Sequence, residues 1–168
     1  MIPVRFWLDT GVFCLLIAIA LLIFVLIPGV GKEINGSQRW LPLGVVSFQP
    51  SEFAKFATIT FLSGYLVRHN ESISRDWFSF LKPILVTLVI AVLLLMEPDF
   101  GAAVIVIGTV GTMLFLAGVR LIHFFCLAAI AAGALAMLAV SVPYRVQRLV
   151  AYVDPWSDPY ANGYQLVQ

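Results

Sequence analysis

Long uninterrupted apolar stretches alternate with short polar breaks along the whole chain. Several stretches approach the roughly 20 residues that a helix needs to cross about 30 Å of hydrocarbon. The stretches are solid rather than alternating, so they predict transmembrane helices and not the strands of a membrane barrel. We expect five helices, at about residues 10–28, 52–67, 78–96, 101–119 and 121–142.

The composition supports the same class of protein. Of the 168 residues, 61% are hydrophobic and 11% are charged, whereas a soluble domain is about half apolar and a quarter charged. The sequence therefore predicts an all-α membrane protein, a polytopic helix bundle in a lipid bilayer. The net charge of +1 and the lack of any Lys/Arg run argue against a surface for nucleic acid.

The two cysteines predict neither a disulfide framework nor a metal site. Cys14 and Cys126 both lie in apolar stretches, where a thiol behaves as a small hydrophobe. We expect no metal ligand and no evident cofactor from these residues. The first apolar stretch follows Arg5, but it is long and has no Ala-x-Ala cleavage site, so we interpret it as a retained helix and not as a signal peptide.

The most polar break, residues 29–51, separates the first two expected helices. It contains Asn35-Gly36, a strong turn signal, and it carries Arg39. The helix that follows begins with Glu52 and Lys55. Ionisable residues at the edge of a membrane are costly and often functional, so these three are candidate site residues.

Glu52 and Lys55 are three residues apart on one expected helix and share a face. Two interpretations remain open. In the first, Glu52 complements the positive end of the helix and Lys55 extends its ammonium group to the interface. In the second, the pair lines a polar cavity together with Arg39 and accepts an anionic head group.

Glu97 and Asp99 flank a proline between two expected helices, at the same membrane face as Arg39. Their carboxylates can therefore approach the basic groups, although capping of the next helix is an equally simple role. Gln49, just before the second expected helix, is a further candidate. We treat these three as possible supporting residues.

Arg145 and Arg148, near the end of the chain, are three residues apart. On a helix this spacing places two guanidinium groups on one face, which suits a pyrophosphate. The Tyr and Trp residues of the same stretch fit an interfacial aromatic belt equally well. Spacing alone does not decide between the two interpretations.

Four separated motifs occur in order and together resemble one family. They are Asn35-Gly36-Ser37-Gln38-Arg39-Trp40; Gln49-Pro50-Ser51-Glu52-Phe53-Ala54-Lys55; Glu97-Pro98-Asp99-Phe100-Gly101; and Pro143-Tyr144-Arg145 through Asp154-Pro155-Trp156, with Gly163-Tyr164-Gln165. The chain resembles the SEDS family of bacterial cell-wall polymerases, and its cell-division branch more than its elongation branch.

The resemblance implies a ten-helix peptidoglycan glycosyltransferase that polymerises lipid II on the outer face of the bacterial cytoplasmic membrane. It also implies partners: a class B penicillin-binding transpeptidase and other division proteins. The chain would then contain the family's third to seventh helices within residues 1–142, and the start of a large extracytoplasmic loop in residues 143–168. Residues 29–51 would be extracytoplasmic too, in agreement with a weak lean of the Lys/Arg distribution.

In the family's chemistry, the 4-hydroxyl of an acceptor sugar attacks C1 of a donor sugar, and undecaprenyl pyrophosphate leaves. A carboxylate takes the hydroxyl proton and cations stabilise the pyrophosphate. By resemblance, Arg39, Glu52 and Lys55 match cavity-lining positions, and Arg145 and Arg148 match the basic start of the loop. A divalent cation is compatible with this chemistry.

The family's essential aspartate lies in a His-Thr-Asp-Phe type motif further along the loop than Gln168. We therefore expect no catalytic residue among these 168 residues and no polymerase activity from them alone. Two other functions remain open. The charged residues can line a path that flips lipid II across the membrane, or the small-residue helix faces can serve as a scaffold for division proteins.

Overall fold

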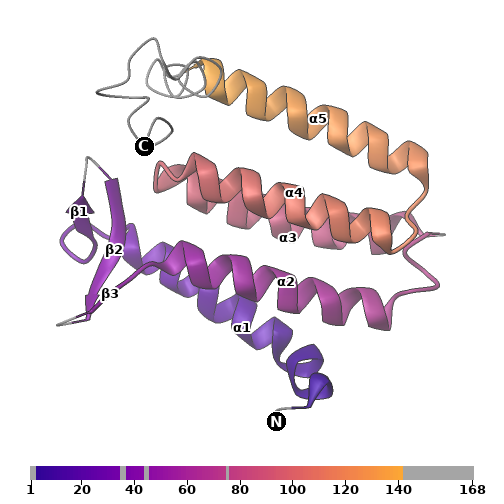
Figure 1. The fold of residues 1–168 in the computed structure, drawn as a ribbon, viewed down its shortest axis with the longest axis horizontal. Helices are drawn as coiled ribbons and strands as arrows, with labels where there is room; N and C mark the ends of the chain where they lie inside the picture. The colour runs from indigo at the N-terminus through magenta and orange to yellow at the C-terminus, as the bar shows by residue number, and fades with distance from the viewer. Residues whose placement is uncertain (1–2, 35–36, 44–45, 75, 142–168) are drawn as a thin grey trace, which may run out of the picture. The chain divides into compact units, whose positions relative to one another are not determined.

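The structure is a computed structural model that describes residues 3–34, 37–43, 46–74 and 76–141. The chain divides into two compact units, Met1–Phe125 and Cys126–Gln168. Figure 1 shows the order of the elements along the chain. The helices are α1 (Val4–Val25), α2 (Pro50–Arg68), α3 (Trp77–Met96), α4 (Phe100–Leu116) and α5 (Leu121–Val140), and the strands are β1 (Lys32–Ile34), β2 (Ser37–Leu43) and β3 (Val46–Phe48).

Each of the five expected helices is present, and the helical bundle predicted from the apolar stretches is confirmed. The largest difference in bounds is at α1, which begins at Val4 instead of residue 10 and ends at Val25 instead of residue 28. Among the described residues, α1, α3 and α5 are long and apolar enough to cross a membrane. Helix α4 is apolar but has 17 residues, and α2 carries charge in its first turns.

The polar break between α1 and α2 folds as a small sheet, which the sequence analysis did not predict. Strands β1, β2 and β3 pair antiparallel in that order, with Ile34 opposite Ser37 and Leu43 opposite Val46. Two residues therefore separate β1 from β2, and they are the Asn-Gly pair at 35–36, which lies outside the described residues. Asn-Gly between two strands is the strongest short hairpin signal, so the sequence did contain a pointer to this hairpin.

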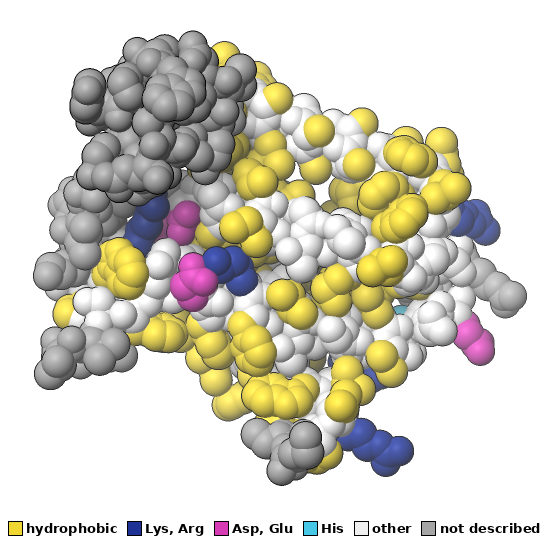
Figure 2. All heavy atoms as spheres, viewed as in Figure 1, with side chains coloured by type: hydrophobic (Ala, Val, Ile, Leu, Met, Phe, Trp, Pro, Cys, Tyr) yellow, Lys and Arg dark blue, Asp and Glu magenta, His cyan; other side chains and the backbone are white. Residues whose placement is uncertain are grey.

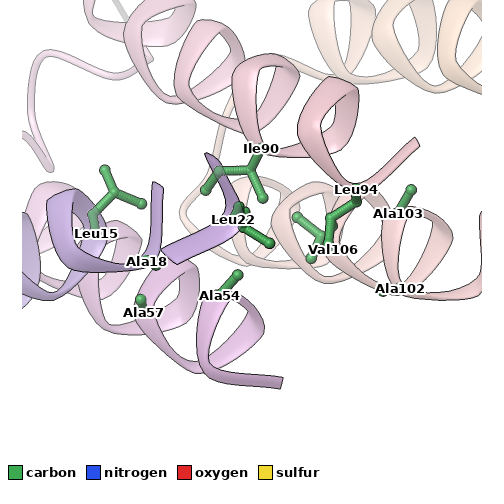
Figure 3. Packing of buried hydrophobic residues seen from close by; sticks show 10 residues of the cluster. All are labelled: Leu15, Ala18, Leu22, Ala54, Ala57, Ile90, Leu94, Ala102, Ala103 and Val106. Atoms are coloured by element: carbon green, nitrogen blue, oxygen red, sulfur yellow. The ribbon is translucent and has the colours of Figure 1, made fainter. Parts of the chain in front are cut away.

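The core of the first unit is a set of aliphatic side chains from four helices (Figure 3). Small side chains on α1, α2 and α4 let the helices approach closely, which is the usual basis of packing in a membrane. The cluster consists of Leu15, Ala18 and Leu22 of α1, Ala54 and Ala57 of α2, Ile90 and Leu94 of α3, and Ala102, Ala103 and Val106 of α4.

Helices α1 and α2 pack closely at two glycines. A β-carbon at Gly64 would lie 2.5 Å from the carbonyl oxygen of Leu8, and one at Gly11 would lie 2.8 Å from Cα of Phe61. No side chain fits at such separations, so glycine is required at both contacts.

The connection between α3 and α4 lies at the same end of the first unit as the sheet (Figure 1). Helix α3 ends at Met96 and α4 begins at Phe100, so only Glu97, Pro98 and Asp99 join two antiparallel helices. We call these three residues the α3–α4 turn. The turn and the sheet together place the polar residues of the predicted site.

The outer surface of the helices is largely apolar, as Figure 2 shows. On α3, for example, Phe78 is 70% exposed and Leu88 is 57% exposed. Charged side chains in the same view lie near the sheet and at the opposite end of the helices, with apolar surface between them (Figure 2). Lipid tails accept the first kind of surface and reject the second, so the distribution fits a protein that spans a bilayer.

Candidate functional site

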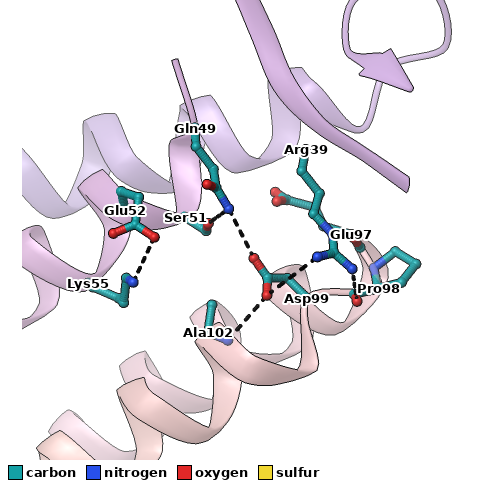
Figure 4. Close-up of polar contacts among 9 residues, drawn as sticks. All are labelled: Arg39, Gln49, Ser51, Glu52, Lys55, Glu97, Pro98, Asp99 and Ala102. Atoms are coloured by element: carbon teal, nitrogen blue, oxygen red, sulfur yellow. Dashed lines mark hydrogen bonds and ion pairs between the residues drawn. The ribbon is translucent and has the colours of Figure 1, made fainter. Parts of the chain in front are cut away.

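Arg39, on β2, binds the α3–α4 turn. Its Nε donates a hydrogen bond to the carbonyl oxygen of Glu97 at 3.0 Å, and an Nη2 hydrogen bond reaches the carbonyl oxygen of Pro98. Its Nη1 lies 3.9 Å from Oδ1 of Asp99. The guanidinium thus donates hydrogen bonds to carbonyl groups just after the last turn of α3. A cation is favoured there because the C-terminal end of a helix is partially negative. We call this set of contacts the Arg39 latch (Figure 4).

Asp99 performs both of the roles that the sequence left open. Its Oδ1 accepts a hydrogen bond from the backbone N–H of Ala102 at 3.2 Å, so it caps α4. It also lies beside the guanidinium of Arg39. The capping interpretation is confirmed for this residue, and it does not exclude the pairing.

Gln49 connects the start of α2 to the start of α4. Its Nε2 donates to Oδ2 of Asp99 at 3.4 Å and to the hydroxyl of Ser51 at 2.8 Å. Because Gln49 immediately follows the sheet and precedes α2, the sheet, α2 and α4 meet at one small group of polar residues (Figure 4).

Glu97 differs sharply from Asp99, two residues away. Its side chain is buried, with 1% of the residue exposed, and in the described part of the chain neither carboxylate oxygen has a hydrogen-bond partner. Burial raises the pKa of Glu97 to about 8; the nearby Asp99 carboxylate raises it further and Arg39 opposes the rise. The group is therefore mainly neutral at pH 7. The capping role proposed for Glu97 is wrong for its side chain, which makes no such bond.

Glu52 and Lys55 form an ion pair on α2, with Nζ of Lys55 2.8 Å from Oε1 of Glu52. The Glu52 side chain is 62% exposed and the Lys55 side chain is 22% exposed. Among the described residues, no hydrogen bond or ion pair joins this pair to Arg39. Figure 4 shows the pair on one side of Gln49 and Ser51 and the Arg39 latch on the other. The predicted site is therefore two neighbouring polar groups on one end of the bundle.

Other parts of the predicted site stay as predictions. Arg145 and Arg148 lie outside the described residues. Within the described ranges, no three His, Cys, Asp or Glu side chains converge as a metal site would require, and a divalent cation stays an expectation of the resemblance. A concavity of about 470 Å³ is lined by residues 67–72, at the far end of α2 from Lys55.

Sequence reasoning missed how Arg39 is held. Its acceptors at Glu97 and Pro98 are backbone carbonyls, and every residue type supplies a carbonyl, so no sequence pattern identifies them. The motifs placed Arg39 and the α3–α4 turn at one membrane face, and the structure shows them in contact.

Comparison with known families gives a match over the whole chain. Residues 1–168 match the sequence model of a family described as "Cell cycle protein", which covers FtsW, RodA and SpoVE.

Curated relatives are similar over nearly the full length of the chain. A protein of Legionella pneumophila named "Probable peptidoglycan glycosyltransferase FtsW" is 53% identical over 97% of this chain, and one of Pseudomonas fluorescens with the same name is 46% identical over 100% of it. The chain covers 41% of the length of each of these relatives.

Two solved structures share the fold. The crystal structure of the rod shape determining protein RodA of Thermus thermophilus has a TM-score of 0.67 and 33% identity, covering 80% of this chain and 42% of that one. A chain of a peptidoglycan synthase complex, described in terms of polymerization and crosslinking, has a TM-score of 0.72 and 31% identity, covering 96% of this chain and 47% of that one.

Proposed function

The chain belongs to the FtsW, RodA and SpoVE family of cell cycle proteins, and from this premise we propose that it is part of a membrane peptidoglycan glycosyltransferase that polymerises lipid II during bacterial cell division. The observation that carries the proposal is the 53% identity to a relative of that name, maintained over 97% of the chain. The fold and the placement of the charged residues support it.

In the proposed reaction, the 4-hydroxyl of an acceptor sugar attacks C1 of a lipid-linked donor. The new bond forms between that oxygen and C1, and the bond from C1 to the pyrophosphate oxygen breaks. The pyrophosphate leaves with the electron pair, and a carboxylate base takes the hydroxyl proton. The base is expected further along the complete protein than Gln168, so the residues described here supply binding and charge.

Lys55 is the cation best placed to meet a pyrophosphate. An ammonium group has three donors, and the bond to Glu52 uses one of them. The ion pair holds the ammonium in place while the remaining donors stay available to phosphate oxygens. Stabilising the charge that builds on the leaving group is the role that preorganised cations perform in such reactions.

Arg39 is the second cation of the proposed site. Two of its five N–H donors are used by the carbonyls of Glu97 and Pro98, so its position is fixed by the protein. We assign it, with Gln49 and Asp99, to supporting the start of α2 beside the head group. Arg145 and Arg148 are proposed to join from the start of the following loop.

The proposal includes a location and a partner. The protein is a polytopic membrane protein, and we place it in the bacterial cytoplasmic membrane with residues 29–51 and 143–168 on the outer side. A class B penicillin-binding transpeptidase is the proposed partner. The similarity to a chain of a peptidoglycan synthase complex supports this choice.

The test is lipid II polymerisation by the complete protein that carries this chain, reconstituted in liposomes with its transpeptidase. Lys55→Met should reduce the yield of glycan polymer at least tenfold, because the ammonium is lost while the apolar stem is kept. Lys82→Met, an exposed lysine of α3, is the matched control and should leave polymerisation unchanged.

The alternatives give different results in the same preparation. Translocation of the lipid II head group without polymer would support a flippase and overturn the proposal. Normal recruitment of division proteins, with neither polymer nor translocation, would support a scaffold.

A further inference from the structure

Glu97 holds a buried carboxyl group that the proposed reaction does not use. It is 1% exposed and, within the described residues, both of its oxygens lack a hydrogen-bond partner. An ionised carboxylate is not tolerated in such a place, whereas a neutral acid is far less costly. The backbone of the same residue accepts the Nε hydrogen bond of Arg39. One residue is therefore both an isolated acid and a part of the Arg39 latch.

The charges around Glu97 balance only when it is neutral. Among the described side chains, Asp99, on its own turn, and Arg39, from β2, are the two charged groups that act on it. Glu52 and Lys55, on α2, are paired with each other. With Glu97 protonated, one carboxylate faces one guanidinium. With Glu97 ionised, Arg39 attracts the new charge and Asp99 repels it. The carboxylate is then buried with no hydrogen-bond donor among the described residues, so its charge favours an arrangement that lets water reach it.

We propose that Glu97 is a positioning residue that works as a protonated acid: its proton keeps the Arg39 latch closed, and loss of the proton releases the sheet from the α3–α4 turn. Arg39 lies on β2, which pairs with β3, and β3 ends at Phe48 directly before Gln49 and α2. Opening the latch therefore loosens the segment that places the start of α2. The inference rests on the proposed function only where activity is measured.

The pKa of about 8 for Glu97 supports this role, and the residue lies outside the membrane-spanning helices. With that pKa, roughly ten molecules in eleven are protonated at pH 7 and roughly one in eleven at pH 9. Because the proton keeps the latch closed, the open fraction should rise as pH increases through this range.

The decisive experiment measures the distance between the sheet and α4 in the complete protein at both pH values. Cys14 and Cys126, with any other cysteine of the complete protein, are replaced by alanine, and spin labels are attached to Ser47→Cys on β3 and Ile105→Cys on α4, which are both exposed. We expect a narrow distance distribution at pH 7 that broadens or lengthens at pH 9, with a midpoint near pH 8.

Three variants sharpen the result. Glu97→Gln is permanently neutral and should keep the pH 7 distribution at pH 9. Arg39→Gln should give the open distribution at both pH values. Glu71→Gln, at an exposed glutamate of the α2–α3 connection, is the matched control and should follow the unmodified protein.

A second readout guards against a Glu97→Gln protein that fails to fold. The infrared carbonyl band of a buried protonated acid should be present in the unmodified protein at pH 7 and should fall about tenfold by pH 9. A distance distribution that is the same at pH 7 and pH 9, or an acid band that is absent at pH 7, would overturn the inference.

Activity is then measured separately. We expect the rate of polymerisation to fall from pH 7 to pH 9 in the unmodified protein and to fall less in Glu97→Gln. This result would show that the closed latch is needed for the reaction. A pH-dependent distance in a protein that makes no polymer leaves the latch intact and counts against the proposed function. Neither spectroscopic readout depends on catalysis, so the two failures are distinguishable.

Discussion

The two ends of α3 each carry a carboxyl group, and their surroundings are opposite. At the first end, Asp76 caps the helix: Oδ2 accepts hydrogen bonds from the backbone N–H of Ser79 at 3.1 Å and from its hydroxyl at 3.0 Å, and Oδ1 accepts from the N–H of Phe78 at 3.4 Å. The Ser79 hydroxyl bond, above all, lowers the pKa of Asp76. The positive end of the helix also favours the ionised form.

At the second end, Glu97 is buried and unpartnered within the described residues, and its pKa is raised to about 8. The negative end of the helix disfavours ionisation there as well. The first end is thus arranged for stability. At the second end, burial of the Glu97 carboxyl group costs free energy, and this is the end that carries the candidate site. Buried ionisable groups with strongly shifted pKa values are expected at functional sites.

The largest expected difference between the two ends of α3 is in how each makes the free energy of unfolding depend on pH. The folded pKa of Glu97 lies above its ordinary value of 4.5, so between pH 4.5 and about 8 the unfolded chain holds fewer protons than the folded one. Stability therefore falls as pH rises through this window. At about 1.4 kcal/mol per pKa unit, we expect a loss of several kcal/mol over this window, measured by unfolding in detergent.

The variant Glu97→Gln should remove most of this slope. Asp76 should contribute the opposite sign in acid, because its folded pKa lies below its ordinary value of 3.8 and its stabilisation is lost as pH falls through the folded pKa. If the free energy of unfolding fell equally with pH in the unmodified protein and in Glu97→Gln, the carboxyl group of Glu97 would not be the cause, and the proposed difference between the two ends of α3 would be wrong.

The next largest effect is expected from removing the cation of the second end. Arg39→Ala leaves the carbonyl of Glu97 without its donor and Asp99 without its guanidinium. Hydrogen bonds that involve a charged group contribute about 2 kcal/mol, so we expect a destabilisation of that size. Arg120→Ala, at an exposed arginine between α4 and α5, should change the free energy of unfolding by less than about 0.5 kcal/mol.

The helices were predictable because a bilayer leaves the backbone few choices. Apolar stretches alone located α2 and α3 to within two residues at each end, and the Asp99 cap was foreseen from its place before α4. The sheet was missed although Asn-Gly at 35–36 signalled a hairpin, because strands as short as β1 and β3, with three residues each, show almost no periodic pattern.

The difference between Glu97 and Asp99 could not be predicted. The two residues stand in one motif and carry the same group, and only the packing of β2 against the α3–α4 turn decides which of them meets Arg39. Burial and a pKa shift depend on the neighbours that the fold supplies. The closeness of Glu52 and Lys55, in contrast, is a local property of residues at i and i+3 of a helix and was expected from their spacing; the structure pairs them.

A smaller effect is expected at the first end of α3. Asp76→Ala removes the acceptor of three hydrogen bonds and the cap of the helix, and loss of such a cap costs about 1 kcal/mol. Asp76→Asn keeps an acceptor and should recover most of the loss. Polymerisation by the complete protein should be unchanged in both variants, since this end lies away from the candidate site. Loss of activity at full stability would show that the two ends are coupled.

The smallest change in stability is expected at the Glu52–Lys55 ion pair of α2, which lies at the same end of the bundle as Glu97. There we expect an effect on activity instead of stability. Glu52 is 62% exposed, and exposed ion pairs contribute about 0.5 kcal/mol because water and salt screen them. Glu52→Gln should therefore unfold almost as the unmodified protein does, yet it frees Lys55 from the position in which we propose that it meets a pyrophosphate. We expect the yield of glycan polymer to fall at least tenfold, whereas Glu71→Gln retains it. A Glu52→Gln protein with full activity would remove the pair from the candidate site and leave it as an ordinary surface contact of the helix.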